Sequence, residues 1–296
     1  MEAKAKPPGR VYEIVTEKIV AALDKGTVPW KQPWVNLGQG GHKNLESKRS
    51  YRGINQLLLQ ISEYEQPWWI TLPGANRLGG QIAKGESPTI VVWTKNVRVK
   101  DKEAEEPDAT KTIWMLRYYK VWNVEQTIGL EERIPEPPES DPDWSPVEQF
   151  GKLVEGYPSP APSIKHIGDE AFYVESKDVV CTPKPEQFST AANYYAAFAH
   201  ELSHSTGHEK RLDRDLDGQM GSESYSKEEL VAEIGAAMLL AEAGIEPLYD
   251  LTASYVDHWR ERLTDDPRLI VTAAAQAQRS CDYIAGRDQE DTDGRD

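Results

Sequence analysis

His200-Glu201-Leu202-Ser203-His204 follows the helix-forming run from Tyr194 to Ala199, and no proline interrupts the chain between Pro185 and Gly207. On a helix, residues i and i+4 lie on one face about 6 Å apart. His200 and His204 can therefore bind one tetrahedral metal ion, for which zinc is the default and manganese the alternative. Glu201 leans off the same face and can accept a proton from water there without binding the metal. A surface helix whose histidines cap it or pair with acids is the plainer interpretation.

A zinc site of this kind needs a third protein ligand. The next helical segment runs from Ser226 to Leu240, and its Ser226 and Glu229 form a capping box that predicts a helix start at residue 226. Glu229 and Glu233 are one turn apart and share a face. By analogy with zincins that take a glutamate from a second helix, we expect Glu229 to bind the metal and Glu233 to support His200. The reverse order of these two glutamates stays open.

Cysteine content and hydropathy favour a cytoplasmic protein. Its 296 residues include only two cysteines, Cys181 and Cys281, which lie far apart and outside any C-x-x-C motif. This pattern argues against a disulfide framework and fits a reducing compartment. The first residues lack the apolar core of a signal peptide, and the longest apolar runs fall short of the roughly 20 residues of a membrane helix. We therefore expect no membrane partner.

Charge is distributed unevenly along the chain. The formal net charge is −15, yet residues 1–100 hold 15 Lys and Arg against 8 Asp and Glu, a balance of +7. Residues 131–296 hold 15 basic against 35 acidic residues, a balance of −20. Such a split is expected if only the front of the chain meets a polyanion.

At 296 residues the chain is long enough for two domains, each able to bury its own core, and we expect an α+β protein of two domains. The first domain, residues 1–130, is expected to hold helices at 11–23 and 55–61 and strands at 89–93, 97–99 and 113–124. A proline-rich acidic linker at 131–150 follows, and a short helix near 147–155 is expected at the beginning of the second domain. The second, mainly helical domain covers residues 151–287, with strands near 171–175 and 178–181. Residues 288–296 form a polar tail that we expect to be disordered.

Tryptophan is concentrated in the front half, where seven of the nine tryptophans fall within residues 1–130. Several lie beside basic residues, an arrangement typical of proteins that stack single-stranded bases on aromatic rings and hold phosphates with cations. Packing in a core remains the usual role of any single tryptophan. The predicted DNA-binding residues are Trp30, Lys31, Trp34, Arg49, Tyr51, Arg52, Trp93, Lys95 and Arg98.

These motifs together resemble the ArdC antirestriction proteins of conjugative plasmids, whose N-terminal domain also has relatives in some plasmid primases. In the front half, the resemblance rests on the pattern from Val15 to Trp30 with Pro33-Trp34, on Tyr51-Arg52-Gly53-Ile54-Asn55 and on Leu78-Gly79-Gly80. In the rear half it rests on the run from Tyr194 to Leu212, on Glu228 to Ala236 and on the segment from Ser254 to Ile284. The resemblance implies a single-stranded-DNA-binding domain, a zincin-like (gluzincin) metallopeptidase domain and protection of transferred plasmid DNA from restriction.

The sequence thus predicts a protein that binds single-stranded DNA and carries a zinc-dependent peptidase site, with a host protein as candidate substrate. His208 and Tyr225 are candidates for stabilising the oxyanion of the reaction. One alternative is a DNA-binding shield whose metal site is structural. Another is a metal-dependent nuclease, although the carboxylate clusters of two-metal nucleases are not evident in the sequence.

Overall fold

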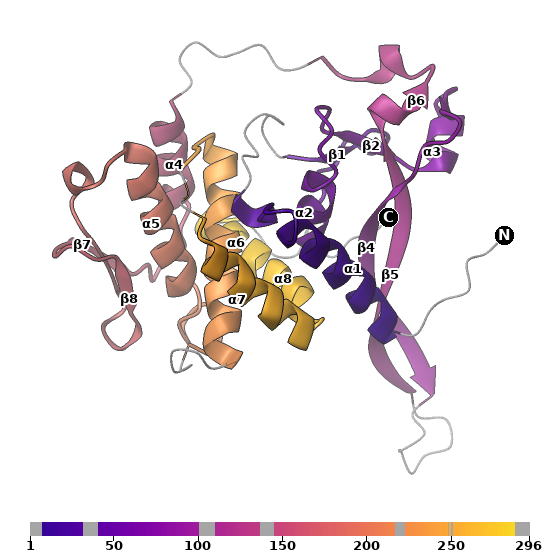
Figure 1. Ribbon diagram of the computed structural model, residues 1–296. Helices are drawn as coiled ribbons and strands as arrows, with labels where there is room; N and C mark the ends of the chain where they lie inside the picture. Colours follow the sequence, from indigo (N-terminus) through magenta and orange to yellow (C-terminus); the bar gives the residue numbers. More distant parts are fainter. Residues whose placement is uncertain are drawn as a thin grey trace.

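The computed structural model describes residues 8–31, 41–100, 110–136, 145–216, 223–247, 249 and 251–287. Helices and small sheets are mixed along the chain, so the fold is α+β, as predicted. A long two-stranded hairpin stands on one side, a group of helices fills the middle, and a small sheet lies on the far side (Figure 1).

The front half combines short helices with a four-stranded sheet of order β1-β2-β5-β4. Its strands are β1 (Lys43–Asn44), β2 (Trp68–Ile70), β4 (Thr89–Lys100) and β5 (Thr110–Asn123), and a second small sheet pairs β3 (Gln81–Ile82) with β6 (Thr127–Ile128). Its helices are α1 (Pro8–Leu23), α2 (Ile54–Gln60) and α3 (Leu72–Arg77), with 3-10 turns η1 (Pro29–Lys31), η3 (Val124–Gln126) and η4 (Glu131–Arg133). The two short strands expected at 89–93 and 97–99 are one continuous strand, because β4 pairs with β5 along its whole length.

The rear half begins with helix α4 (Pro146–Glu155) and a three-stranded sheet of order β7-β9-β8. These strands are β7 (Ser163–His166), β8 (Phe172–Val174) and β9 (Val179–Thr182), with 3-10 turns η5 (Glu175–Lys177) and η6 (Pro185–Gln187). Four helices complete this half: α5 (Ala191–Ser205), α6 (Glu223–Ala243), α7 (Ala253–Asp265) and α8 (Leu269–Ile284). Helix α6 already includes Glu223, so the predicted start at Ser226 is wrong. Ser226 is buried inside the helix, where its hydroxyl accepts hydrogen bonds from Arg262.

One hydrophobic core runs through both halves. Val15 and Ile19 of α1 are fully buried in the same cluster as Trp259 of α7 and Ile270 of α8. The two halves therefore share this core, because the apolar stripe of α1 packs against rear-half helices as well as against the front sheet. The predicted linker at 131–150 overlaps η4 and α4. Residues 137–144 and the predicted tail at 288–296 lie outside the described residues.

Within the described parts of the chain, we find no helix with both the length and the hydropathy needed to cross a bilayer.

Candidate metal centre

Helix α5 presents the two histidines of the H-E-x-x-H motif. Thr190 caps its first turn, since the side-chain oxygen accepts the backbone N–H of Asn193 at 3.1 Å. Phe198 and Leu202, which are one turn apart, are buried in the core and fix the rotation of the helix. His200 and His204 consequently lie at the border of the core, with 24% and 14% of their side chains exposed.

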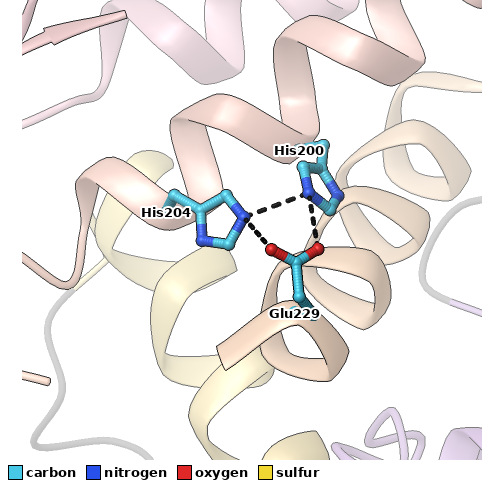
Figure 2. Close-up of side chains that lie close together, drawn as sticks. All are labelled: His200, His204 and Glu229. Carbon is cyan, nitrogen blue, oxygen red and sulfur yellow. Dashed lines mark hydrogen bonds and ion pairs between the residues drawn. The ribbon is translucent and has the colours of Figure 1, made fainter. Parts of the chain in front are cut away.

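Helix α6 packs closely against α5 and brings Glu229 to the histidines. Gly235 allows this approach, since a Cβ atom added there would lie 2.8 Å from the Ser203 hydroxyl oxygen. A glycine at the crossing point lets the two helix backbones come closer than larger side chains would permit. Glu229, a turn and a half earlier on α6, thereby faces the H-E-x-x-H motif (Figure 2).

Three side chains converge on one point. The Nε2 atoms of His200 and His204 are 3.0 Å apart, and the Glu229 carboxylate oxygens lie 3.5 Å from His200 Nε2 and 3.6 Å from His204 Nε2 (Figure 2). Ligands about 2.1 Å from a tetrahedral ion lie roughly 3.4 Å from one another. The two nitrogens and the carboxylate therefore fit a divalent metal ion, and they form the one such group found among the described residues.

Glu228 fixes the orientation of His204. Its Oε1 lies 3.2 Å from His204 Nδ1, so a proton on Nδ1 leaves Nε2 with its lone pair toward the metal position. Arg214 donates to both carboxylate oxygens, at 2.7 and 2.9 Å. Burial by itself would raise the pKa of Glu228, but the Arg214 and His204 contacts outweigh it and lower the pKa below its ordinary value.

Glu229 is held as a carboxylate by its neighbours. Burial opposes the charged form, yet the hydrogen bond with His200 and the charges of both histidines lower the pKa of Glu229. The Tyr225 hydroxyl also donates to this carboxylate. Tyr225, one of the two predicted oxyanion residues, is thus placed at the metal centre.

Glu201 lies beside the same centre and is buried, with 8% of the residue exposed. Burial raises the pKa of Glu201, and the Glu229 charge adds to this effect, while His200 and a hydrogen bond from the backbone N–H of Tyr173 act in the opposite direction. Tyr173 belongs to β8, the edge strand that pairs with β9 on one side. The open edge of this small sheet therefore faces Glu201.

Glu233 does not have the predicted role. Its carboxylate accepts hydrogen bonds from Trp30 Nε1, at 2.8 Å, and from the Tyr255 hydroxyl, and it lies 3.7 Å from Lys31 Nζ. These contacts turn Glu233 toward the front half of the chain. Besides Glu229, the acid that contacts a histidine of the motif is Glu228. Glu228 and Glu233 share no face, since they are five positions apart on the helix.

His208 is buried, and its Nδ1 accepts the backbone N–H of Lys210 at 3.1 Å. No contact within the described part of the chain joins it to the three metal-binding candidates. Its predicted oxyanion role therefore gains no support from the structure.

The predicted DNA-binding residues are scattered. Trp30 is fully buried against Trp259, with ring centroids 6.1 Å apart, and cannot stack on a base. Lys31 pairs with Glu233 and lies over the Tyr249 ring at 4.3 Å. Arg52 pairs with the buried Asp282 of α8. Trp30 and Lys31 therefore join the two halves of the chain, and Arg52 contributes to the same junction.

The remaining predicted DNA-binding residues divide into two groups. Arg49 is exposed, Tyr51 is half-buried with its hydroxyl accepting from Asn44, and Trp93 is half-buried on the β4–β5 hairpin. Trp34 and the side chains of Lys95 and Arg98 lie outside the described residues.

Sequence reasoning missed three groups at the metal centre: Glu228, Arg214 and the N–H of Tyr173. The acidic pair Glu228-Glu229 was a usable signal, because adjacent acids on a helix point about 100° apart and can serve a ligand and its neighbour. Arg214 and Tyr173 are brought to the site by tertiary packing, for which the sequence held no local signal.

The fold and the site define a class of protein, a zincin-like metallopeptidase domain joined to a second, α+β unit. A family model for zincin-like metallopeptidases matches residues 159–276, and one for the N-terminal domain of the anti-restriction factor ArdC matches residues 9–122. The chain belongs to the ArdC family.

Relatives of known structure support this assignment. The metal-free crystal structure of the antirestriction protein ArdC from plasmid R388 is 34% identical, with a TM-score of 0.73, over 92% of this chain and 96% of that one. The Mn(II)-bound structure of the same protein gives 33% identity and a TM-score of 0.72.

Three further relatives match nearly the whole length of this chain. An uncharacterised protein, y4eC, from Sinorhizobium fredii is 32% identical over 94% of this chain and 92% of its own length. Two DNA primases TraC from Escherichia coli are each 34% identical, over 96% and 97% of this chain. The chain spans only 20% and 28% of the length of these primases.

Proposed function

We propose that this protein protects incoming plasmid DNA from restriction, binds single-stranded DNA through its front half, and hydrolyses a peptide bond of a host protein at its metal centre. The observation that carries the peptidase proposal is the convergence of His200, His204 and Glu229 next to the buried Glu201. The antirestriction role and the DNA partner are supported by membership of the ArdC family.

Zinc is the proposed metal, with manganese as the alternative. Two imidazole nitrogens and one carboxylate suit a borderline divalent ion and leave one coordination position open, as in catalytic zinc sites. The manganese alternative is supported by the Mn(II)-bound structure of the R388 relative.

When bound, the metal would polarise the scissile carbonyl and lower the pKa of water. Glu201 would accept the proton of the attacking water and pass it to the leaving nitrogen, a role suited to a carboxylate whose pKa is raised by burial. Glu228 would keep the His204 ring in the orientation that binds the metal. Tyr225, which donates to Glu229, is the remaining candidate for contacting the oxyanion.

The substrate would enter as an extended segment along β8. This edge strand lies at Glu201 and pairs on its other side with β9, so its open edge can hydrogen-bond an added strand. Phe172 of β8 is 41% exposed and offers an apolar contact for a substrate side chain. These features support a protein or peptide substrate in preference to a nucleic acid at this centre.

Conjugation into a restricting recipient tests the proposal. Wild type, Glu201→Gln and the exposed matched control Glu209→Gln are compared for protection of the incoming plasmid, with a restriction-deficient recipient as the reference. We expect Glu201→Gln to bind metal yet lose protection, and Glu209→Gln to behave as wild type. Full protection by Glu201→Gln would show that hydrolysis is dispensable, and the shield interpretation with a structural metal would replace ours.

A further inference from the structure

The buried or paired state of Trp30, Lys31 and Arg52 leaves open which surface of the front half meets DNA. The strands β4 and β5 are rich in basic residues, whereas the segment 101–109 between them holds five Asp or Glu and one Lys. The two strands contain six Lys or Arg residues and no Asp or Glu, in a protein whose net charge is −15. A polyanion is therefore favoured as the partner of the two strands and not of the acidic segment that joins them.

The register of the hairpin brings three side chains onto one face. Trp93 lies opposite Arg117, and Tyr119 follows Arg117 by two residues and lies opposite Val91. Directly opposed residues, and residues two apart, share a face of an antiparallel pair. The rings of Trp93 and Tyr119 accordingly make an edge contact, with centroids 6.4 Å apart and planes at 61°.

The two faces of the hairpin have different surroundings. Ile90, Val92 and Leu116 on one face are buried in the large core that includes α1 and α2, and α1 lies beside the hairpin in Figure 1. The other face begins in a small apolar cluster with Val91 and Val121 and continues to Trp93, Arg117 and Tyr119. One face of the hairpin is thus packed against the core, while the part of the other face around Trp93, Arg117 and Tyr119 stays accessible.

Tyr119 is 46% exposed, and Arg117 is exposed as well. Among the residues that the structure describes, Arg117 forms no ion pair. Half-exposed rings beside an available guanidinium are the elements of a surface that stacks bases and holds phosphates.

We propose that Trp93, Arg117 and Tyr119 form the platform on which this protein binds single-stranded nucleic acid. Bases unstacked from a strand pack on the two rings, and Arg117 contacts the phosphate between them. Duplex DNA binds less well because its bases are stacked inside the helix and cannot reach the rings. This inference rests on the single-strand binding proposed above and assigns it to a surface.

Fluorescence anisotropy with a labelled oligo-dT strand and a duplex of equal length tests the platform in the full-length protein. Tyr119→Ala is expected to weaken single-strand binding about tenfold, since one stacked base contributes roughly 1–3 kcal/mol. Tyr119→Phe keeps the ring and should bind as wild type. Arg117→Gln should reduce the dependence of log K on log salt concentration by about 0.7, the value for one phosphate contact on a single strand. Ile167→Ala, a change at an exposed apolar residue of the rear half, is the control and should leave affinity unchanged.

The possible results distinguish an error in the proposed platform from an error in the proposed single-strand binding. If wild type binds the strand and both Tyr119→Ala and Arg117→Gln bind equally well, the platform is wrong while single-strand binding stands. If wild type fails to bind the strand, or prefers the duplex, both the platform and the proposed single-strand binding are overturned. Thermal unfolding of each variant checks that a loss of affinity is not a loss of structure.

Discussion

Replacing Trp30 tests how the two halves of the chain are joined. The Trp30 side chain is fully buried, it packs edge-on against Trp259, and its Nε1 donates to Glu233 at 2.8 Å. Removing a buried tryptophan side chain costs about 3–5 kcal/mol. Glu233 keeps its contacts with Lys31 and Tyr255, so the lost hydrogen bond adds only about 1 kcal/mol.

We therefore expect Trp30→Ala to lower the free energy of unfolding by roughly 4–6 kcal/mol, a large share of the ~5–15 kcal/mol typical of folded proteins. Trp30→Phe retains most of the apolar contact and should cost about 1–2 kcal/mol, chiefly the missing N–H donor. Urea unfolding followed by circular dichroism measures both values.

The same two variants distinguish a packing residue from a DNA-stacking residue. Because Trp30 is inaccessible, Trp30→Phe should keep the single-strand affinity of wild type within about twofold in the anisotropy assay. A Trp30→Ala variant destabilised by less than about 1 kcal/mol would refute the burial argument. A stable Trp30→Phe variant that binds DNA tenfold more weakly would restore the role predicted from sequence.

Three further outcomes are expected. Glu228→Gln should weaken metal affinity about 10–100-fold in competition with a chelator, because Nδ1 of His204 loses the carboxylate that orients the ring. Gly235→Ala should lower the thermal midpoint and the metal affinity, since its Cβ would lie 2.8 Å from Ser203 Oγ and force α5 and α6 apart. If the midpoint and the affinity stay as in wild type, close packing of the two helices is not what positions Glu229. The Arg211 hydrogen bonds lower the pKa of Asp178 from 3.8, so this pair stabilises the fold above about pH 4 and the effect is lost as pH falls through the lowered pKa. The difference in unfolding free energy between wild type and Asp178→Asn should accordingly be larger at pH 7 than at pH 3.

The parts of the site that depend on local helix geometry were predictable from sequence. The spacing of His200 and His204 determines that they share a face, and Glu229 on the next helix supplied the acid such a site requires. The supporting acid was assigned incorrectly. Helical spacing shows that Glu233 shares the face of Glu229, but it cannot show that this part of α6 packs against the front half, where Glu233 meets Trp30.

The DNA-binding residues illustrate a second limit. Neighbouring aromatic and basic residues in the sequence are compatible with an exposed platform and with a buried junction. Trp30 is buried by residues more than 200 positions away, and no local pattern encodes that contact. The strands of the hairpin were recognisable from their β-branched and aromatic residues, whereas the face shared by Trp93, Arg117 and Tyr119 depends on a register that becomes definite only once β4 is paired with β5.

The most direct test of the proposed metal centre is the metal content of the full-length protein after dialysis, measured by inductively coupled plasma mass spectrometry. Wild type and Glu201→Gln should each retain about one divalent ion per chain, and Glu229→Gln should retain almost none, because two histidines alone rarely hold such an ion against water. The exposed control Glu209→Gln should match wild type. Retention of metal by Glu229→Gln, or its loss from Glu201→Gln, would contradict the proposed roles of ligand and base.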